Sequence, residues 1–325
     1  MKKVLVTGGA GFIGSNLCKA LIDKGYYVAC LDNLSTGHIK NIQSLINDYP
    51  DRFKFILGDI RDLNTCKDAI KNSDCIFHEA ALGSIPRSIK DPIQTNDVNI
   101  NGFLNMLVAA RDEGTPKFIF AASSSTYGDS QELPKIENNI GKPLSPYALT
   151  KFVNELYADV FSKTYGIKYI GLRYFNVFGR WQDPNSAYAA VIPLFIKLLM
   201  SHQQPTINGD GFNTRDYTYI DNVIHMNMLA LETAKDNAIN QIYNVAGGER
   251  TSTNDLFLHI RTELSKYDPE ILSIEPIYGP FRKGDVLHSL ASIEKGREML
   301  GYIPLVNFKE GLRRTVAWYW KSVFN

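Results

Sequence analysis

The feature that most constrains the fold is a glycine-rich loop at residues 8–14, Gly-Gly-Ala-Gly-Phe-Ile-Gly. It directly follows a short apolar run at residues 4–7 and directly precedes a helical pattern at residues 14–24. Glycines allow a tight turn and a close approach to a pyrophosphate, while the free N–H groups of the following helix attract anions. The loop therefore predicts the first strand–loop–helix unit of a dinucleotide-binding fold.

Short apolar runs continue to alternate with longer helical patterns beyond this loop, which is typical of repeated βαβ units. The sequence thus predicts the α/β class, with a Rossmann-type doubly wound parallel sheet covered by helices on both faces. The expected strands are residues 4–7, 27–31, 53–57, 75–78, 118–122, 169–174 and 241–245, and the expected long helices are residues 14–24, 99–112 and 146–165.

An acidic residue supports the dinucleotide site. Asp32 ends the second expected strand, eighteen residues after Gly14, where its carboxylate can accept hydrogen bonds from both ribose hydroxyls. No arginine follows it directly to receive a 2′-phosphate, so the sequence favours NAD over NADP. Asp59 follows the third strand and is either close to the adenine or part of an ordinary strand-end turn. His78, which ends the fourth strand, is interpreted as a packed or capping histidine.

The sequence pattern changes after Asn176, where turn-forming segments interrupt the apolar runs. We predict an NAD-binding domain from residues 1–176 plus 219–248, and a smaller C-terminal substrate-binding lobe from residues 177–218 plus 249–325. No linker-like or low-complexity segment separates the two parts, so they should pack closely with a cleft between them.

Composition excludes several other classes of protein. The 35 Lys and Arg residues nearly balance 34 Asp and Glu residues, which gives no reason to expect nucleic acid or a membrane as a partner. The apolar run at the N-terminus is too short for a signal peptide, and we expect a soluble cytoplasmic protein. The four cysteines have no C-x-x-C spacing and are expected to be reduced core thiols rather than disulfides or metal ligands: Cys18, Cys30, Cys66 and Cys75.

Tyr147 and Lys151 form a Y-x-x-x-K pair in the expected helix 146–165, one helical turn apart and therefore on one face. An ammonium beside a phenol favours the phenolate, so Lys151 is expected to lower the pKa of Tyr147 and make it a usable base. Lys151 would also hold the nicotinamide ribose. The pair is common on solvated helices, and its catalytic interpretation depends on the dinucleotide site in the same chain.

A serine-rich turn follows the fifth expected strand, at the edge of the sheet where such folds hold their ligands. A hydroxyl from this turn can bridge the phenol of Tyr147 and the reacting oxygen of a substrate. An ordinary serine-rich turn is the alternative when the motif is considered alone.

With these motifs the chain resembles the extended short-chain dehydrogenase/reductases, and among them the nucleotide-sugar 4-epimerases related to UDP-galactose 4-epimerase. The resemblance spans the whole chain. It rests on the glycine loop, the serine-rich turn, Tyr147 with Lys151, residues 172–176, and Arg282 with Asp285. Residues 81–88 and 187–193 further resemble the bacterial UDP-N-acetylglucosamine 4-epimerases that serve surface-polysaccharide synthesis.

The resemblance implies a mechanism with tightly bound NAD that is regenerated in each cycle, and without a metal. A tyrosine takes the proton from O4 of the sugar as the C4 hydride leaves. The 4-keto sugar then rotates in the pocket, and the hydride and the proton return to its opposite face. The implied catalytic residues are Ser123, Tyr147 and Lys151. The implied cofactor-binding residues are Gly8, Gly11, Phe12, Ile13, Gly14, Asp32, Asn33, Asp59, Ile60, Ala81, Tyr147, Lys151 and Tyr174.

The implied substrate is a UDP-sugar, whose diphosphate suits the forked donors of Arg215 and Arg282, with Asp285 on the nucleotide ribose. Ser289 and Ala190 are small where a larger side chain would crowd a 2-acetamido group, which favours UDP-GlcNAc and UDP-GalNAc; whether uronic acid forms are accepted stays open. The implied substrate-binding residues are Gly83, Ser84, Arg87, Ser123, Ser124, Ser125, Tyr147, Asn176, Ala190, Val191, Arg215, Arg282, Asp285 and Ser289.

Two other functions are consistent with parts of the sequence. A nucleotide-sugar 4,6-dehydratase or decarboxylase shares the fold, but a dehydratase should carry an Asp-Glu pair where this chain has Ser124 and Ser125. A non-enzymatic NAD-binding regulator usually lacks the tyrosine or the lysine, and both are present. Relatives form homodimers through a four-helix bundle, to which residues 99–112 and 146–165 would contribute here. The alternative is that the apolar faces of these two helices only pack on the sheet.

Overall fold

The computed structural model describes residues 1–185, 189–281 and 287–324. Its centre is a seven-stranded sheet in the order β11-β6-β5-β4-β1-β2-β3, in which every neighbouring pair is parallel. The predicted Rossmann-type sheet is confirmed, and each strand lies within one residue of its expected bounds. The strands are β1 (Lys3–Thr7), β2 (Tyr27–Asp32), β3 (Phe53–Leu57), β4 (Cys75–His78), β5 (Phe118–Ser123), β6 (Tyr169–Tyr174) and β11 (Gln241–Val245).

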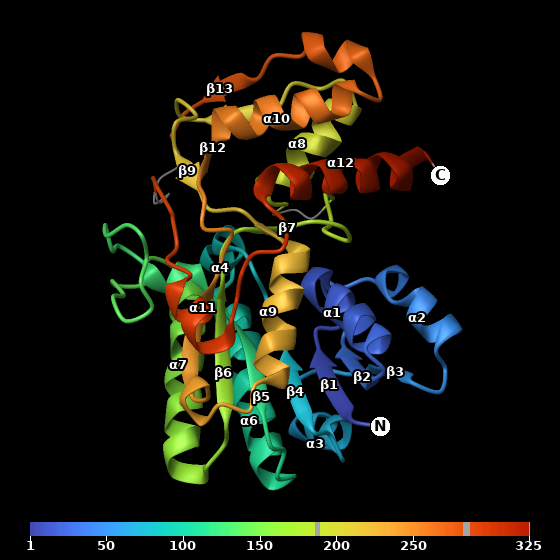
Figure 1. The fold of residues 1–325 in the computed structure, drawn as a ribbon, viewed down its shortest axis with the longest axis vertical. Helices are drawn as coiled ribbons and strands as arrows, with labels where there is room; N and C mark the ends of the chain where they lie inside the picture. The colour runs from blue at the N-terminus through green and yellow to red at the C-terminus, as the bar shows by residue number, and fades with distance from the viewer. Residues whose placement is uncertain (186–188, 282–286, 325) are drawn as a thin grey trace.

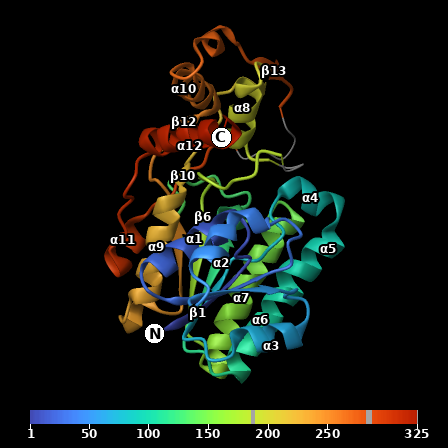
Figure 2. The ribbon, with the colours of Figure 1, turned by 90° about the vertical axis from the view of Figure 1, so that its right-hand side faces the viewer.

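Helices cover both faces of this sheet, as Figures 1 and 2 show. Helices α1 (Phe12–Asp23) and α9 (Ile220–Glu232) pack on one face, and α3 (Leu63–Ile70), α6 (Gly102–Asp112) and α7 (Pro146–Tyr165) pack on the other. Successive side chains of a strand point to opposite faces. In β1, Val4 and Val6 accordingly join the core under α1, while Leu5 joins the core under α6.

The ends of α7 follow from local sequence signals. The Ser145 hydroxyl accepts a hydrogen bond from the backbone N–H of Ala148, Pro146 occupies the first turn, and Gly166 ends the helix in a left-handed conformation. The prediction of a helix over residues 146–165 is confirmed. The predicted helix 14–24 begins two residues earlier, at Phe12.

The predicted helix 99–112 is confirmed with one difference, because it starts within a π-helical turn, η2 (Asp97–Asn101). Asn99 lies in this turn and is buried. Its side chain binds the backbone N–H and C=O of Leu82, at 2.8 and 3.2 Å, and the Thr150 hydroxyl at 3.1 Å. Leu82 follows the end of β4 and lines the candidate site. The π-helical turn is therefore next to that site, where such turns are frequent.

The remaining elements lie mostly above the carboxyl ends of the sheet, where Figures 1 and 2 show α8, α10 and α12 together. Their apolar side chains belong to the same continuous core as those of α1 and α9. The division into an NAD-binding domain and a smaller lobe, at the boundaries given above, stays a prediction. These elements are α2 (Gln43–Asp48), α4 (Ile85–Lys90), α5 (Pro92–Asn96), β7 (Val177–Phe178), α8 (Val191–Met200), β8 (Thr206–Asn208), β9 (Thr214–Arg215), β10 (Thr218–Tyr219), β12 (Thr251–Ser252), α10 (Thr253–Ser265), β13 (Ile277–Gly279), α11 (Glu294–Leu300) and α12 (Phe308–Phe324).

A buried carboxylate ties this upper region to the end of the sheet. Asp216 has no exposed surface, and its carboxylate accepts hydrogen bonds from the backbone N–H groups of Gly247, Gly248 and Ala291 at 2.9, 3.2 and 3.2 Å. Burial raises the pKa of Asp216 to about 7, while these N–H groups act in the opposite direction. Two separate chain segments, at residues 247–248 and at residue 291, are thus fixed to one side chain.

All four cysteines are buried and free, as expected for core thiols. Among the described residues, no helix has the length and apolar composition needed to cross a membrane.

Candidate active site

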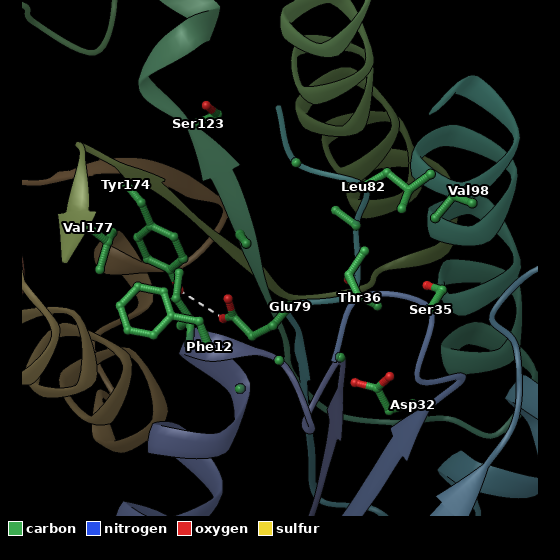
Figure 3. A pocket seen from close by; sticks show the side chains of 18 of the residues that line it. Phe12, Asp32, Ser35, Thr36, Glu79, Leu82, Val98, Ser123, Tyr174 and Val177 are labelled. Carbon is green, nitrogen blue, oxygen red and sulfur yellow. Dashed lines mark hydrogen bonds between the residues drawn. The ribbon is translucent and has the colours of Figure 1, made fainter. Parts of the chain in front are cut away.

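A cleft of about 600 Å³ lies at the carboxyl ends of the central strands. Its walls come from the loop after β1, the ends of β2, β4, β5 and β6, the first turns of α7, and the segment before α8. The strand order reverses between β1 and β4, and open α/β sheets bind their ligands at this kind of switch point. Figure 3 shows the side chains that project into this cleft.

The glycine loop forms a backbone cradle on one side of the cleft. Gly8 has φ +68°, and a Cβ there would lie 2.7 Å from Cα of Ala80. A Cβ on Gly14 would lie 2.2 Å from the carbonyl oxygen of Gly8. No side chain caps the N-terminus of α1, so its first N–H groups remain available to an anion. The cradle therefore fits a dinucleotide pyrophosphate.

Asp32 supports the loop from the end of β2. Its buried carboxylate accepts hydrogen bonds from the backbone N–H groups of Ala10 and Leu34 at 2.9 and 2.8 Å. Burial raises the pKa of Asp32 above its usual value. The side chain lines the cleft, as the prediction of a ribose ligand requires.

Most of the predicted cofactor-binding residues line this cleft. They are Gly8, Gly11, Phe12, Ile13, Gly14, Asp32, Asn33, Ile60, Ala81, Tyr147, Lys151 and Tyr174. Asp59 lies beside the cleft rather than in its lining. Its carboxylate accepts hydrogen bonds from Asn33 and Arg61, which lower its pKa to about 2. His78 is buried, its Nδ1 lies 3.0 Å from the Thr7 hydroxyl, and the prediction of a packed histidine is confirmed.

Tyr147, Lys151 and Ser123 line the same cleft as Asp32, and the Ser123 hydroxyl forms a hydrogen bond with the Tyr147 phenol. The Lys151 ammonium is buried and donates a hydrogen bond to the Ala121 carbonyl at 2.8 Å, which fixes it against β5. The Ser123 hydroxyl is held by Ser125, whose backbone N–H and hydroxyl lie 3.1 and 2.8 Å from it. The fold thus places a phenol, an ammonium and a hydroxyl, from three separate positions in the sequence, in one cleft.

The direction of the Tyr147 pKa differs from the expectation. Burial raises the pKa of the phenol above its usual value, and the Ser123 hydroxyl acts in the opposite direction. The expected lowering by Lys151 is therefore wrong in this structure, since the loss of hydration dominates at the phenol. Burial also lowers the pKa of Lys151 to about 8, while Glu79 and Glu155 counteract this effect.

Glu79 is a cleft residue that the sequence did not reveal. It follows His78 at the end of β4, and its Oε1 accepts a hydrogen bond from the Tyr174 hydroxyl at 2.8 Å, the dashed line in Figure 3. The Asn227 amide in turn donates to the Tyr174 hydroxyl at 2.9 Å. Burial raises the pKa of Glu79 to about 7. A single acidic residue after the end of a strand carries no signal of its own in the sequence.

A second contact that the sequence did not reveal joins two segments that line the cleft. Nε2 of His38, in the loop after β2, lies 3.3 Å from Oδ2 of Asp183 in the segment before α8. Both residues line the cleft, together with Ser35, Thr36 and Gln182. Ser35 and Thr36 could have been found, because they lie three and four residues after Asp32, in the loop at the same strand end. His38 and Asp183 are 145 residues apart, and no local pattern joins them.

The predicted substrate-binding residues fall into three groups. Gly83, Arg87, Ser123, Tyr147, Asn176 and Ala190 line the cleft. Ser84, Ser124, Ser125, Val191, Arg215 and Ser289 lie outside its lining: Ser84 caps α4, Val191 begins α8, and Arg215 donates to the carbonyls of Thr214 and Leu287. Arg282 and Asp285 lie outside the described residues.

This fold and this cleft define an extended short-chain dehydrogenase/reductase. Comparison with known proteins is more specific: residues 4–246 match the NAD dependent epimerase/dehydratase family, and the chain belongs to that family. NAD is accordingly its cofactor, and the cradle around Gly8 and Gly14 fits that molecule.

Relatives and solved structures match this chain over nearly its full length. A putative UDP-glucose 4-epimerase from Methanocaldococcus jannaschii is 39% identical over 317 residues, which is 97% of each chain. A UDP-N-acetylglucosamine 4-epimerase from Methanobrevibacter ruminantium, solved with UDP-N-acetylmuramic acid, is 38% identical with a TM-score of 0.91 over 99% of each chain. A UDP-glucose 4-epimerase from Thermus thermophilus, solved with NAD, is 33% identical with a TM-score of 0.85 over 98% of each chain.

Proposed function

We propose that this protein is a UDP-sugar 4-epimerase that inverts the C4 hydroxyl of its substrate by transient oxidation. The observation that carries the proposal is the meeting of Tyr147, Lys151 and Ser123 in the same cleft as the glycine loop. The full-length similarity to several 4-epimerases supports the same reaction. NAD supplies the hydride acceptor, and later the hydride donor, when it is bound.

The residues of this chain provide the acid–base and positioning steps. The Tyr147 phenol exchanges the O4 proton of the sugar, and the Ser123 hydroxyl aligns that oxygen with the phenol. Lys151, fixed by the Ala121 carbonyl, holds positive charge beside them in a site of low water content. The 4-keto sugar rotates while its diphosphate remains bound, and the hydride then returns to the opposite face of the sugar ring.

Ser124 and Ser125 favour an epimerase over a 4,6-dehydratase. Elimination of water across C5 and C6 needs an acid and a base next to the catalytic hydroxyl, and hydroxyl side chains supply neither near neutral pH. Ser125 instead hydrogen-bonds to Ser123. The presence of both Tyr147 and Lys151 likewise favours an enzyme over a non-catalytic NAD-binding regulator.

We further propose a preference for the N-acetylated pair UDP-GlcNAc and UDP-GalNAc, whose products would serve as precursors of surface polysaccharide. Ala190 presents only a methyl group to the cleft. Ser289 is connected to the cleft through two hydrogen bonds: its hydroxyl accepts from the Asp216 N–H at 3.3 Å, and the Asp216 carbonyl accepts from the Asn176 amide at 2.8 Å. A small side chain at position 289 therefore lies behind a residue of the cleft wall.

A Ser289→Tyr variant tests this preference. We expect kcat/KM for UDP-GlcNAc to fall by about tenfold or more, because the larger ring takes the space of the acetamido group. The value for UDP-Glc should change by less than about threefold. Rates for both sugars, measured side by side on the wild type and the variant, give the comparison. An equal loss on both sugars would show that position 289 does not limit the size of the substrate.

We also propose that the protein forms a homodimer through α6 and α7, as its resemblance to dimeric relatives implies. The outward face of α7 carries Leu149, Leu156 and Val160, which are 51%, 50% and 51% exposed. A stripe of large apolar side chains at helical spacing is costly to leave in water. A two-fold contact between two copies of α7 would cover it.

A Leu156→Glu variant tests the dimer. The substitution places a carboxylate in each copy of the contact, and we expect the dimer to dissociate at least 100-fold more readily. Sedimentation velocity measures the effect. Leu258→Glu, at a similarly exposed apolar position on α10, is the matched control and should leave the dimer intact. A wild-type monomer, or a dimer unaffected by Leu156→Glu, would contradict the proposed interface.

A further inference from the structure

Glu79 occupies an unusual position for an acidic side chain. Its Oε1 accepts a hydrogen bond from the Tyr174 hydroxyl, and its Oε2 is buried without a hydrogen-bond partner among the described residues. Figure 3 shows this carboxylate close to Phe12 at the start of α1 and to Tyr174. A buried carboxylate with one oxygen left without a hydrogen bond lowers the stability of the fold. Its presence here indicates that its charge has a role in the cleft.

The Lys151 ammonium lines the same cleft and carries the opposite charge. Glu79 raises the pKa of Lys151 and Lys151 lowers that of Glu79, which means that each favours the charged form of the other. The other titratable groups that face Glu79 carry no charge near neutral pH. Burial keeps the phenols of Tyr174 and Tyr147 protonated and lowers the pKa of His78 to about 3. Glu155 also raises the pKa of Lys151, but it is paired with Arg173 and lies outside the cleft lining, so Glu79 is the carboxylate of the lining that opposes Lys151.

We propose that Glu79 is a positioning residue that makes this cleft favour oxidised over reduced NAD, by opposing the charge of Lys151. The oxidised nicotinamide ring carries a positive charge and the reduced ring carries none. An unopposed ammonium in the same cleft would therefore disfavour the oxidised form. The oxidised form must be restored at the end of each catalytic cycle, and Glu79 favours that return.

Glu79→Gln removes the charge while keeping the shape and an acceptor for Tyr174. We expect the equilibrium ratio of reduced to oxidised cofactor in the purified holoenzyme to rise about tenfold at pH 7.5. That change corresponds to a midpoint potential about 30 mV higher for a two-electron couple. The ratio is read from the absorbance of the reduced cofactor while the protein equilibrates with a redox dye of known potential. No sugar is present, so the result is independent of the proposed epimerisation.

Two further measurements keep the proposal falsifiable. Glu79→Asp retains the charge and should stay within about threefold of the wild-type ratio. If a variant loses its cofactor on purification, separate titrations with NAD⁺ and NADH give the same comparison, with NAD⁺ weakened about tenfold relative to NADH. A Glu79→Gln ratio within about twofold of the wild type, or a Glu79→Asp ratio equal to that of Glu79→Gln, would overturn the proposal.

Discussion

Replacing Tyr147 by phenylalanine should lower the rate of epimerisation by about 10³-fold, because the variant has no phenol to exchange the O4 proton of the sugar. The ring itself is retained, so packing at the start of α7 should not change. NAD and the UDP-sugar should still bind, since neither needs the phenolic proton. Initial rates and the NAD content of the purified variant are the two measurements.

Tyr157→Phe is the matched control, because it makes the same chemical change ten residues further along the same helix, away from the cleft. Its rate should stay within about twofold of the wild type. A Tyr147→Phe variant that keeps more than a tenth of the wild-type rate would exclude Tyr147 as the main acid–base group.

Replacing Arg173 by methionine should lower the free energy of unfolding by about 3–5 kcal/mol, because it leaves Glu155 as an uncompensated buried charge. The two side chains are 3% and 7% exposed and form two hydrogen bonds, of 2.9 and 2.7 Å. The guanidinium also donates to the Glu137 carbonyl and lies 4.8 Å from the centre of the Tyr127 ring. The pair joins β6 to α7 at a position four residues after Lys151.

Urea denaturation of the single and double variants separates this charge effect from packing. We expect Arg173→Met combined with Glu155→Met to recover more than half of the lost free energy, since no charge then remains buried. The double variant should not recover all of the lost free energy of unfolding, because the hydrogen bond from Arg173 to the Glu137 carbonyl stays absent. A double variant as unstable as the sum of the two single variants would show that packing, rather than the unpaired charge, accounts for the loss.

The predicted residues that the structure brings together in one cleft all rest on local sequence patterns. The glycine loop, Asp32 and the Tyr147–Lys151 pair each combine a few residues at fixed spacing with a strand end or a helical turn. Backbone geometry then places them at one edge of the sheet, because parallel strands end on the same side. This is why a single sequence sufficed for the sheet and for most of the cofactor cleft.

The parts that the sequence did not reveal depend on contacts between distant segments. Glu79 meets Tyr174 across 95 residues, and His38 meets Asp183 across 145. The pKa of Tyr147 was predicted in the wrong direction because spacing along a helix gives proximity to Lys151 but not the degree of burial. Electrostatic properties of a cleft are set by the whole fold, so they cannot be read from one motif.

The proposed reaction also explains why one carboxylate and one ammonium share the catalytic end of the cleft. An enzyme that oxidises and then reduces the same carbon must not stabilise either redox state of its cofactor too strongly. Lys151 places a positive charge in the cleft, and Glu79 opposes that charge.

The most direct test of the central claim uses UDP-GlcNAc and UDP-Glc carrying deuterium at C4, incubated with the purified protein without added NAD. Transient oxidation at C4 predicts UDP-GalNAc or UDP-Gal of unchanged mass, with the deuterium still at C4 and the configuration inverted. NMR of the product reports position and configuration together. A product lighter by water or carbon dioxide, an inverted sugar that has exchanged its deuterium with solvent, or no product even after NAD is supplied would contradict the account.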